Sequence, residues 1–251
     1  MKHIKLFETV AAFETARATL DLPNVSLTVD NNMVHYNPYD PYNGYEYVDL
    51  GLSVKWAKWN VGANSESDSG LYFQWGDTQG YTAEQVGSGE GQKYFGWNDY
   101  KYSNNGGSTA TAMTKYNSTD GKTVLEASDD AARANMGSNW RMPTYDEFSE
   151  LINTANTTSA WTTVNGVYGA MFTSKKSGYT DKYVFFPAAG ACSDGSLGNK
   201  GSSGFVWSSS LYSSIVVYGR VLYFYDGYRN VDFGNRCDGY SVRGVLDDSN
   251  S

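Results

Sequence analysis

The residues with the greatest capacity for chemistry in this chain are its two cysteines, Cys192 and Cys237. A thiolate is a nucleophile and a metal ligand, and two thiols can form a disulfide. Two cysteines so far apart in the sequence suit neither a disulfide-rich framework nor a zinc site with four ligands. The sequence therefore predicts neither of these two arrangements, and it leaves open whether Cys192 and Cys237 form a single bridge.

Other candidate ligands and bases are scattered. His3 and His35 have no nucleophile or ligand partner at a useful spacing, so a structural or exposed role is expected. Calcium takes about six to eight oxygen ligands, and Asp226, Asp232 and Asp238 are spaced too irregularly to provide them. The glycine-rich run at 87–92 lacks the strand–loop–helix context of a phosphate loop. We therefore predict no catalytic residue, no metal and no cofactor.

The stretch from Trp207 to Leu246 has instead the composition of a binding surface. It mixes Tyr, Ser, Asn, Asp, Gly, Val and Arg, and after Trp207 it contains no Lys, Glu, Gln, Met or further Trp. Tyrosine offers a large, fairly rigid contact area that is both apolar and polar. We interpret this stretch as the functional surface and the rest of the chain as its scaffold.

Composition limits the alternatives. The chain has 251 residues, 18% of them charged, and a net charge of −8, so it lacks the basic patch of a nucleic-acid binder. No apolar run is long enough to span a membrane, and the first residues lack the apolar segment of a secretory signal. The 21 tyrosines are equally compatible with binding and with an all-β or loop-rich domain.

The first 44 residues read as a separate unit. The pattern predicts a strand at 3–7, a helix from about 9 to 20 and a β-hairpin formed by 25–29 and 33–36, with a turn-rich linker at 37–44. A unit this small buries little on its own, so we expect it to dock on the next domain or to form a homo-oligomer.

Residues 45–247 read as an α+β domain. We expect strands at 47–52, 54–61, 71–75, 182–186, 204–211, 221–225 and 240–246, and a long loop-rich insertion at 78–125. A short helix is expected at 131–136 after Asp129 and Asp130. A second begins with the capping box of Thr144 and Glu147 and continues through Phe148, Leu151, Ile152 and Ala155.

Several strings in this domain resemble a family found in gut Bacteroidetes and their phages. These strings are YVDLGLSVKWA at 47–57, NVGA at 60–63, YFQWG at 72–76, WRMPT at 140–144 with Glu147 and Phe148, and GYSVR at 239–243. The resemblance implies a C-type lectin fold of the kind shared with formylglycine-generating enzymes, with small antiparallel sheets, two helices and long loops. The first 45 residues are similar to the attachment part of phage tail fibres and would form a small α/β appendage.

Within that family, the pattern from Trp207 to Arg243 resembles the variable proteins of diversity-generating retroelements, in which adenines of a template copy are mutated. Mutated AAC or AAT codons cannot yield the five residue types that are missing after Trp207. The resemblance implies a variable region at 207–246 held by a fixed framework, which comprises Trp207, Leu211, Leu222, Phe224, Arg236, Ser241, Val242 and Arg243. The ligand-binding positions would be Tyr212, Ser214, Val217, Tyr218, Val221, Tyr223, Tyr225, Asp226, Tyr228, Asn230, Asp232, Phe233, Gly234, Asn235, Cys237 and Asp238.

The strand at 221–225 gives this division a geometric basis. Successive side chains of a strand point to opposite faces, so if Leu222 and Phe224 enter the core, Val221, Tyr223 and Tyr225 face outward. The alternative is a strand that is buried on both faces.

The implied fold also occurs with two other activities. A formylglycine-generating enzyme needs a close cysteine pair, and Cys237 falls in the stretch predicted to vary, so we predict that the chain is not an enzyme. Trp97-Asn98-Asp99 resembles a short motif of calcium lectins, but it lies in the loop-rich insertion, and loop packing is the preferred interpretation for Trp97.

The sequence thus predicts a diversified receptor-binding protein of a phage tail fibre, located on the virion. Its partner would be a protein or glycan on a bacterial surface. The alternative is a C-type lectin-like domain of fixed sequence on a bacterial cell surface, with a structural or glycan-binding role.

Overall fold

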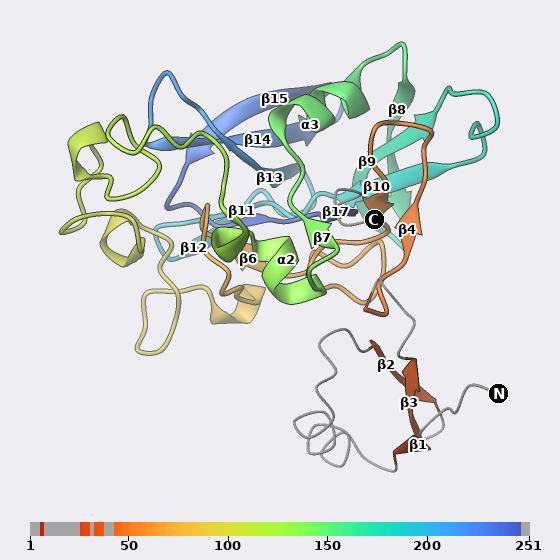
Figure 1. The fold of residues 1–251 in the computed structure, drawn as a ribbon, viewed down its shortest axis with the longest axis horizontal. Helices are drawn as coiled ribbons and strands as arrows, with labels where there is room; N and C mark the ends of the chain where they lie inside the picture. The colour runs from red at the N-terminus through yellow and green to blue at the C-terminus, as the bar shows by residue number, and fades with distance from the viewer. Residues whose placement is uncertain (1–5, 8–25, 31–32, 38–42, 247–251) are drawn as a thin grey trace. The chain divides into compact units, whose positions relative to one another are not determined.

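The computed structural model describes residues 6–7, 26–30, 33–37 and 43–246 of the chain. The chain divides into two compact units, Met1–Glu46 and Tyr47–Ser251, which are described separately here (Figure 1). The smaller unit contains a three-stranded antiparallel sheet in the order β1 (Leu6–Phe7), β3 (Met33–Asn37) and β2 (Ser26–Asp30). The predicted hairpin pairs as expected, with Val29 opposite Val34. The predicted helix at 9–20 lies outside the described residues.

The larger unit is organised around a five-stranded sheet. Its order is β15 (Tyr228–Asn235), β14 (Tyr218–Tyr225), β13 (Ser203–Leu211), β16 (Tyr240–Ser241) and β6 (Tyr72–Phe73). Neighbouring strands are antiparallel except β13 and β16, which are parallel. The sequence patterns did not predict β15. This strand pairs with β14 along its whole length and forms one edge of the sheet.

Smaller sheets surround this one. A four-stranded sheet joins β4 (Tyr47–Val48), β5 (Trp56–Ala57), β17 (Val245–Leu246) and β7 (Trp140–Arg141). A three-stranded sheet joins β10 (Tyr183–Pro187), β9 (Val167–Ser174) and β8 (Thr157–Val164), and β11 (Ala191–Ser193) pairs with β12 (Ser196–Gly198). The strands predicted between 47 and 61 are therefore much shorter than expected, and the β8–β9 hairpin was not predicted.

The described residues contain two α-helices, α2 (Ala131–Met136) and α3 (Tyr145–Ile152). Asp130 caps α2, and Thr144 and Glu147 form the predicted capping box of α3. Helix α3 ends at Ile152, so the prediction that its apolar stripe reaches Ala155 is wrong. The last carbonyls of α3 are taken by side chains that follow it, because Thr157 Oγ1 donates to Leu151 O (2.6 Å) and Asn156 Nδ2 donates to Glu150 O (2.9 Å).

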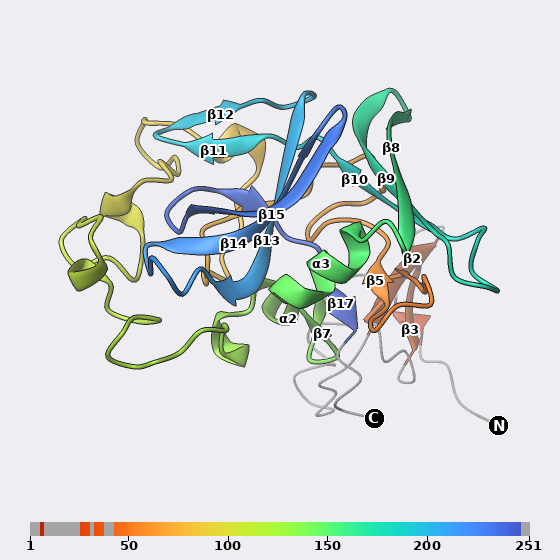
Figure 2. The ribbon, with the colours of Figure 1, turned by 90° about the horizontal axis from the view of Figure 1, so that it is seen from above.

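The main core lies between α3 and one face of the five-stranded sheet. It contains Phe148 and Leu151 of α3, Leu222 and Phe224 of β14, and aromatic side chains from the smaller sheets, including Trp56, Phe172 and Phe186. Figure 2 shows α3 and the β11–β12 hairpin on opposite sides of β13 and β14. The β11–β12 hairpin therefore lies over the face of the sheet opposite α3, where Trp207 and Val221 are also buried.

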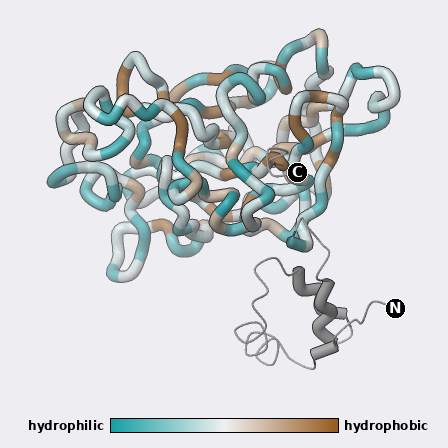
Figure 3. Tube along the Cα trace, viewed as in Figure 1, coloured by the Kyte–Doolittle hydropathy of each residue, from teal (hydrophilic) through white to brown (hydrophobic). Residues whose placement is uncertain are grey.

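The segment 78–125 is irregular, as its composition predicts. Among its described residues it has short 3₁₀ turns, η1 (Ala83–Gln85), η2 (Trp97–Asp99) and η3 (Ala110–Ala112), and isolated β-bridges. The loops at the left of Figure 3 that contain it are mostly hydrophilic. Small antiparallel sheets, two helices in the described part and long loops together make an α+β fold, as expected. No described helix is long and apolar enough to cross a membrane.

Candidate binding surface

The side chains of β14 point alternately to the core and to the opposite face of the sheet. Leu222 and Phe224 are fully buried under α3, whereas Tyr225 on the opposite face is 40% exposed. Residues that are directly opposite on neighbouring strands share a face, so Tyr223 lies on the same face as Phe205 of β13 and Asn230 of β15. The outward orientation predicted for Tyr223 and Tyr225 agrees with this register.

Aromatic rings form a continuous series on that face. The centroid of Trp207 lies 4.3 Å from that of Tyr240, and Phe205 lies 5.1 Å from Tyr240 and 4.5 Å from Tyr223. Tyr225 and Tyr228 stack at 4.8 Å with their planes 15° apart. The series begins at buried Trp207 and ends at exposed tyrosines. We call its accessible part the tyrosine face, which comprises Phe205, Tyr223, Tyr225, Tyr228 and Asn230.

The polar groups of the tyrosine face are available. Within the described ranges, the hydroxyls of Tyr223, Tyr225 and Tyr228 have no hydrogen-bond partner. A tyrosine hydroxyl can both donate and accept, and the rings that carry these three are held against one another by stacking. The surface thus offers flat apolar area with hydroxyls whose positions are fixed in advance.

Val221 does not belong to this surface, and its predicted outward position is wrong. It shares a face with Tyr223 but is only 1% exposed. Its partner across the ladder is Trp207, which is fully buried and donates its indole N–H to Phe73 O at 2.8 Å. Val221 therefore lies on the covered part of this face of the sheet, and the accessible part begins at Tyr223.

Four more predicted contact residues are also buried and are removed from the accessible surface. Val217 and Cys237, 8% and 3% exposed, pack with Tyr100 and Met113 of the long insertion. A Cβ atom on Gly234 would lie 2.5 Å from the Tyr240 ring. Asp238 accepts hydrogen bonds from Ser193 Oγ (3.1 Å), Asn235 Nδ2 (3.2 Å) and the Tyr240 hydroxyl (3.0 Å). These four residues are therefore not accessible to a ligand.

A second group of predicted residues gathers at the edge of the sheet, on the α3 side. Phe233, 45% exposed, has its ring 4.8 Å from Tyr212 and 4.9 Å from Tyr218. The guanidinium of Arg220 lies over Tyr212 at 4.4 Å and over Tyr145 at 4.5 Å. We call these five residues the edge cluster. Because it lies on the other face of β14 and β15, it is separate from the tyrosine face.

The remaining predicted residues lie in turns or beside these clusters. Ser214 is exposed in the β13–β14 loop, and Asp226 is exposed in the β14–β15 turn. Asp232 is partly buried and accepts the Phe233 amide at 2.9 Å. Asn235 is partly buried and donates to Asp238, as described above.

Phe205, Arg220 and Tyr145 contribute to these surfaces but were not predicted. Phe205 could have been found, because it lies two residues before Trp207 in the same strand and so shares its face. Tyr145 carried no such signal, since it lies at the start of a helix far away in the sequence.

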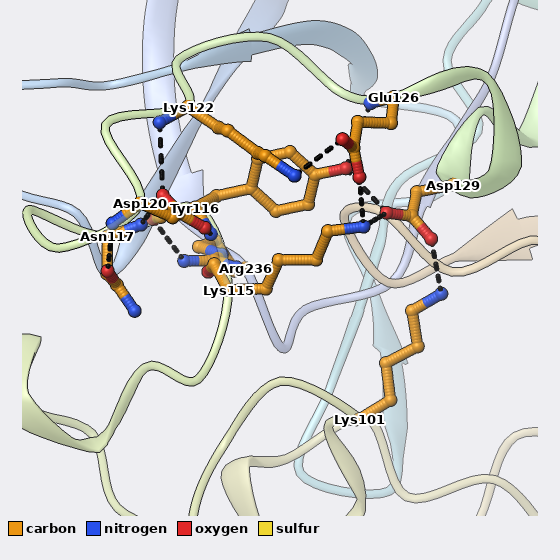
Figure 4. Close-up of polar contacts among 9 residues, drawn as sticks. All are labelled: Lys101, Lys115, Tyr116, Asn117, Asp120, Lys122, Glu126, Asp129 and Arg236. Atoms are coloured by element: carbon orange, nitrogen blue, oxygen red, sulfur yellow. Dashed lines mark hydrogen bonds and ion pairs between the residues drawn. The ribbon is translucent and has the colours of Figure 1, made fainter.

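Two buried arginines tie the surface to the scaffold. The Arg236 guanidinium donates to Val216 O and Lys115 O, both at 2.9 Å, and to the Tyr100 hydroxyl at 2.8 Å. Lys115 in turn forms an ion pair with Asp129, as Figure 4 shows. Arg243 donates to Ala57 O and Lys58 O at 3.0 Å. Both arginines were predicted as framework, and both hold backbone carbonyls in place.

Neither thiol has the character of a nucleophile. Both cysteines are buried and free, so no bridge joins them. Burial, followed by the nearby charge of Asp238, raises the pKa of Cys192 to about 12 and that of Cys237 still higher. A thiol is reactive as the thiolate, so both are protonated and unreactive at neutral pH.

The motif at 97–99 is used for loop structure. Trp97 packs edge-on against Tyr100 (5.8 Å), and the Asp99 carboxylate accepts the amides of Phe95 (3.1 Å) and Gly96 (2.8 Å) and pairs with Lys93 (3.1 Å). In the part of the chain that the structure describes, no three His, Cys, Asp or Glu side chains are grouped so that they could hold a metal ion.

Comparisons with known proteins return no relative. No protein-family model, no curated protein and no solved structure matches the chain. The function must therefore be argued from the surface itself.

Proposed function

We propose that this chain is a receptor-binding protein of a phage tail fibre, with a C-type lectin fold and a C-terminal surface diversified by adenine-directed mutagenesis. The tyrosine face is the observation that carries the proposal. It combines stacked rings with unpartnered hydroxyls, and such surfaces supply contact area and hydrogen bonds at a low entropic cost.

The support beneath this face suits a surface that varies. Its strands belong to a sheet whose other side is packed against α3, and Arg236 and Arg243 hold neighbouring loops through backbone oxygens, which exist whatever the side chains are. Substitution of an outward tyrosine therefore changes the contacts offered to a ligand without changing the core.

The binding claim is tested with the full chain, labelled with a fluorophore, on a panel of gut Bacteroidetes cells. We expect the triple variant Tyr223→Ser, Tyr225→Ser, Tyr228→Ser to lose about tenfold or more of its affinity, since aromatic anchors dominate such interfaces. The control changes three exposed tyrosines elsewhere, Tyr47 (38%), Tyr94 (40%) and Tyr183 (38%), to Ser. Equal loss in both triple variants contradicts the proposal.

The diversification claim is tested on DNA. We expect a near-copy of the codons for 207–246 beside a reverse-transcriptase gene, differing from them almost only at adenines. A copy that differs at many other bases, or no copy at all, rejects diversification and favours a bacterial surface domain of fixed sequence.

A further inference from the structure

A small hollow extends the tyrosine face onto residues outside the variable region. It lies between β8 and the tip of the β14–β15 hairpin, has a volume of about 60 Å³, and is lined by Ser159, Trp161, Ala170, Tyr225, Tyr228 and Arg229. None of the residues from β8 was identified from the sequence. Tyr225 and Tyr228 belong to both the hollow and the tyrosine face.

The walls of the hollow are aromatic. Trp161 is stacked on Tyr168, with centroids 6.1 Å apart and planes at 9°, and Tyr168 is 52% exposed. Tyr225 and Tyr228 form the second stacked pair, at 4.8 Å. Trp161 also packs partly against the main core, so its ring is held in place. The apolar C–H face of a ligand ring can therefore lie against preformed aromatic surfaces.

The polar groups around these walls have no partners. Among the described residues, nothing hydrogen-bonds to Ser159 Oγ, Trp161 Nε1, the hydroxyls of Tyr225 and Tyr228, or the Arg229 guanidinium. An aromatic or aliphatic occupant would desolvate these groups without pairing them, which is unfavourable. An occupant rich in hydroxyls pairs them instead.

The size of the hollow restricts the occupant further. A volume of 60 Å³ holds on the order of four water molecules. One edge of a sugar ring, with its hydroxyls, takes the place of these waters, whereas a folded peptide segment is too large to enter. We propose that this hollow is a binding site for a single pyranose ring of a surface glycan, with Trp161 as an anchor that does not vary.

This inference rests on the proposed function and specifies its ligand. Trp161 lies outside 207–246, so the same sugar contact would persist while the tyrosines around it change. One shallow site binds weakly, and several copies on a fibre raise the apparent affinity without any new contact.

The test uses the full chain and the methyl glycosides of glucose, galactose, mannose and N-acetylglucosamine. Saturation-transfer NMR at millimolar concentrations reports which ring protons approach the protein. We expect a signal from at least one glycoside, weakened about tenfold or more in Trp161→Ala and in Tyr228→Ser. The variant Tyr94→Ser, which changes an exposed tyrosine of the long insertion, should bind as the unmodified chain does. Near-UV circular dichroism verifies that Trp161→Ala is folded, and Tyr228→Ser carries the test if it is not.

Three results overturn the inference: no signal from any of the four glycosides, a signal that neither substitution changes, or tighter binding of N-acetyl-phenylalanine amide than of every glycoside. Cell binding distinguishes this failure from failure of the proposed function. If Trp161→Ala retains full cell binding while the tyrosine-face triple variant loses it, the sugar site is rejected and the receptor-binding role stands.

Discussion

At the scale of single residues, Gly234 has no room for a side chain, although it is one of the positions predicted to vary. Its peptide lies directly beneath Tyr240, whose ring would be 2.5 Å from a Cβ atom at position 234. Tyr240 is itself stacked on Trp207 and Phe205, so the ring has little room to move. A side chain at this position therefore displaces the aromatic series on which the tyrosine face rests.

We expect Gly234→Ala to lower the free energy of unfolding by about 1–3 kcal/mol, the usual effect of overpacking. The matched control is Gly198→Ala, because a Cβ there meets nothing within 4 Å. Urea unfolding of both variants provides the measurement. Equal stability of the two would show that Tyr240 moves aside easily and that position 234 is free to vary.

At the scale of elements, the long insertion is fixed to the helical side of the domain through Asp129. The Asp129 carboxylate receives hydrogen bonds from Lys115 Nζ and the Tyr116 hydroxyl, while the carbonyls of Lys115 and Tyr116 accept from Arg236 (Figure 4). Asp129 thus holds the insertion beside the start of α2, and Arg236 holds the same two residues beside the turn after β15. Irregular loops of this length acquire order from such contacts and not from repeated backbone pairing.

The same carboxylate predicts an acid-sensitive step. Burial alone would raise the pKa of Asp129, but the hydrogen bonds from Lys115, Tyr102 and Tyr116 outweigh it and lower the pKa from 3.8 to about 2. Because the folded-state pKa lies below the unfolded one, the stabilisation is complete above about pH 4 and is lost as the pH falls toward 2.

We therefore expect Asp129→Asn to reduce the free energy of unfolding by about 1.5–3 kcal/mol at neutral pH, the range for a hydrogen bond to a charged group. The difference from the unmodified chain should shrink between pH 4 and 2, as measured by thermal unfolding across that range. The control is Asp226→Asn in the exposed β14–β15 turn. A pH-independent difference for Asp129→Asn would contradict the assignment.

At the scale of the whole molecule, the larger unit contains its own complete core. The residues of the main core come from positions between Leu50 and Val245 of the sequence. Strand β17, at the C-terminal end of the described chain, pairs with β5, which lies near the start of the larger unit. A unit that closes on itself in this way is expected to fold without the preceding residues.

The fragment 47–251 should therefore unfold cooperatively with a Tm within about 2 °C of that of the same unit in the full chain, which corresponds to less than about 1 kcal/mol. Calorimetry of both proteins measures this. Sedimentation of the same samples tests the predicted role of the first unit, since an oligomer that depends on residues 1–46 is lost in the fragment. A fragment without a cooperative transition would show that the two units are not independent.

The sequence by itself determined the features that depend on local spacing. The capping box of Thr144 and Glu147 marked the start of α3, and the alternation of Leu222 with Tyr223 separated the core side of β14 from its outer side. The predicted framework arginines, Arg236 and Arg243, are buried as expected for residues that hold a backbone. These signals succeed because helix caps and strand alternation involve residues that are close in the chain.

Only the tertiary structure decided how much of each face is open. Val221 has the same alternation as Tyr223, yet it is buried because Trp207 and its surroundings cover it. Cys237 is buried by the insertion, more than a hundred residues earlier in the chain. Trp161 lines the same hollow as Tyr225 and Tyr228 for the same reason, since β8 meets the β14–β15 tip only after folding. Periodicity assigns a side chain to one face of a strand, whereas exposure depends on which distant segment packs against that face.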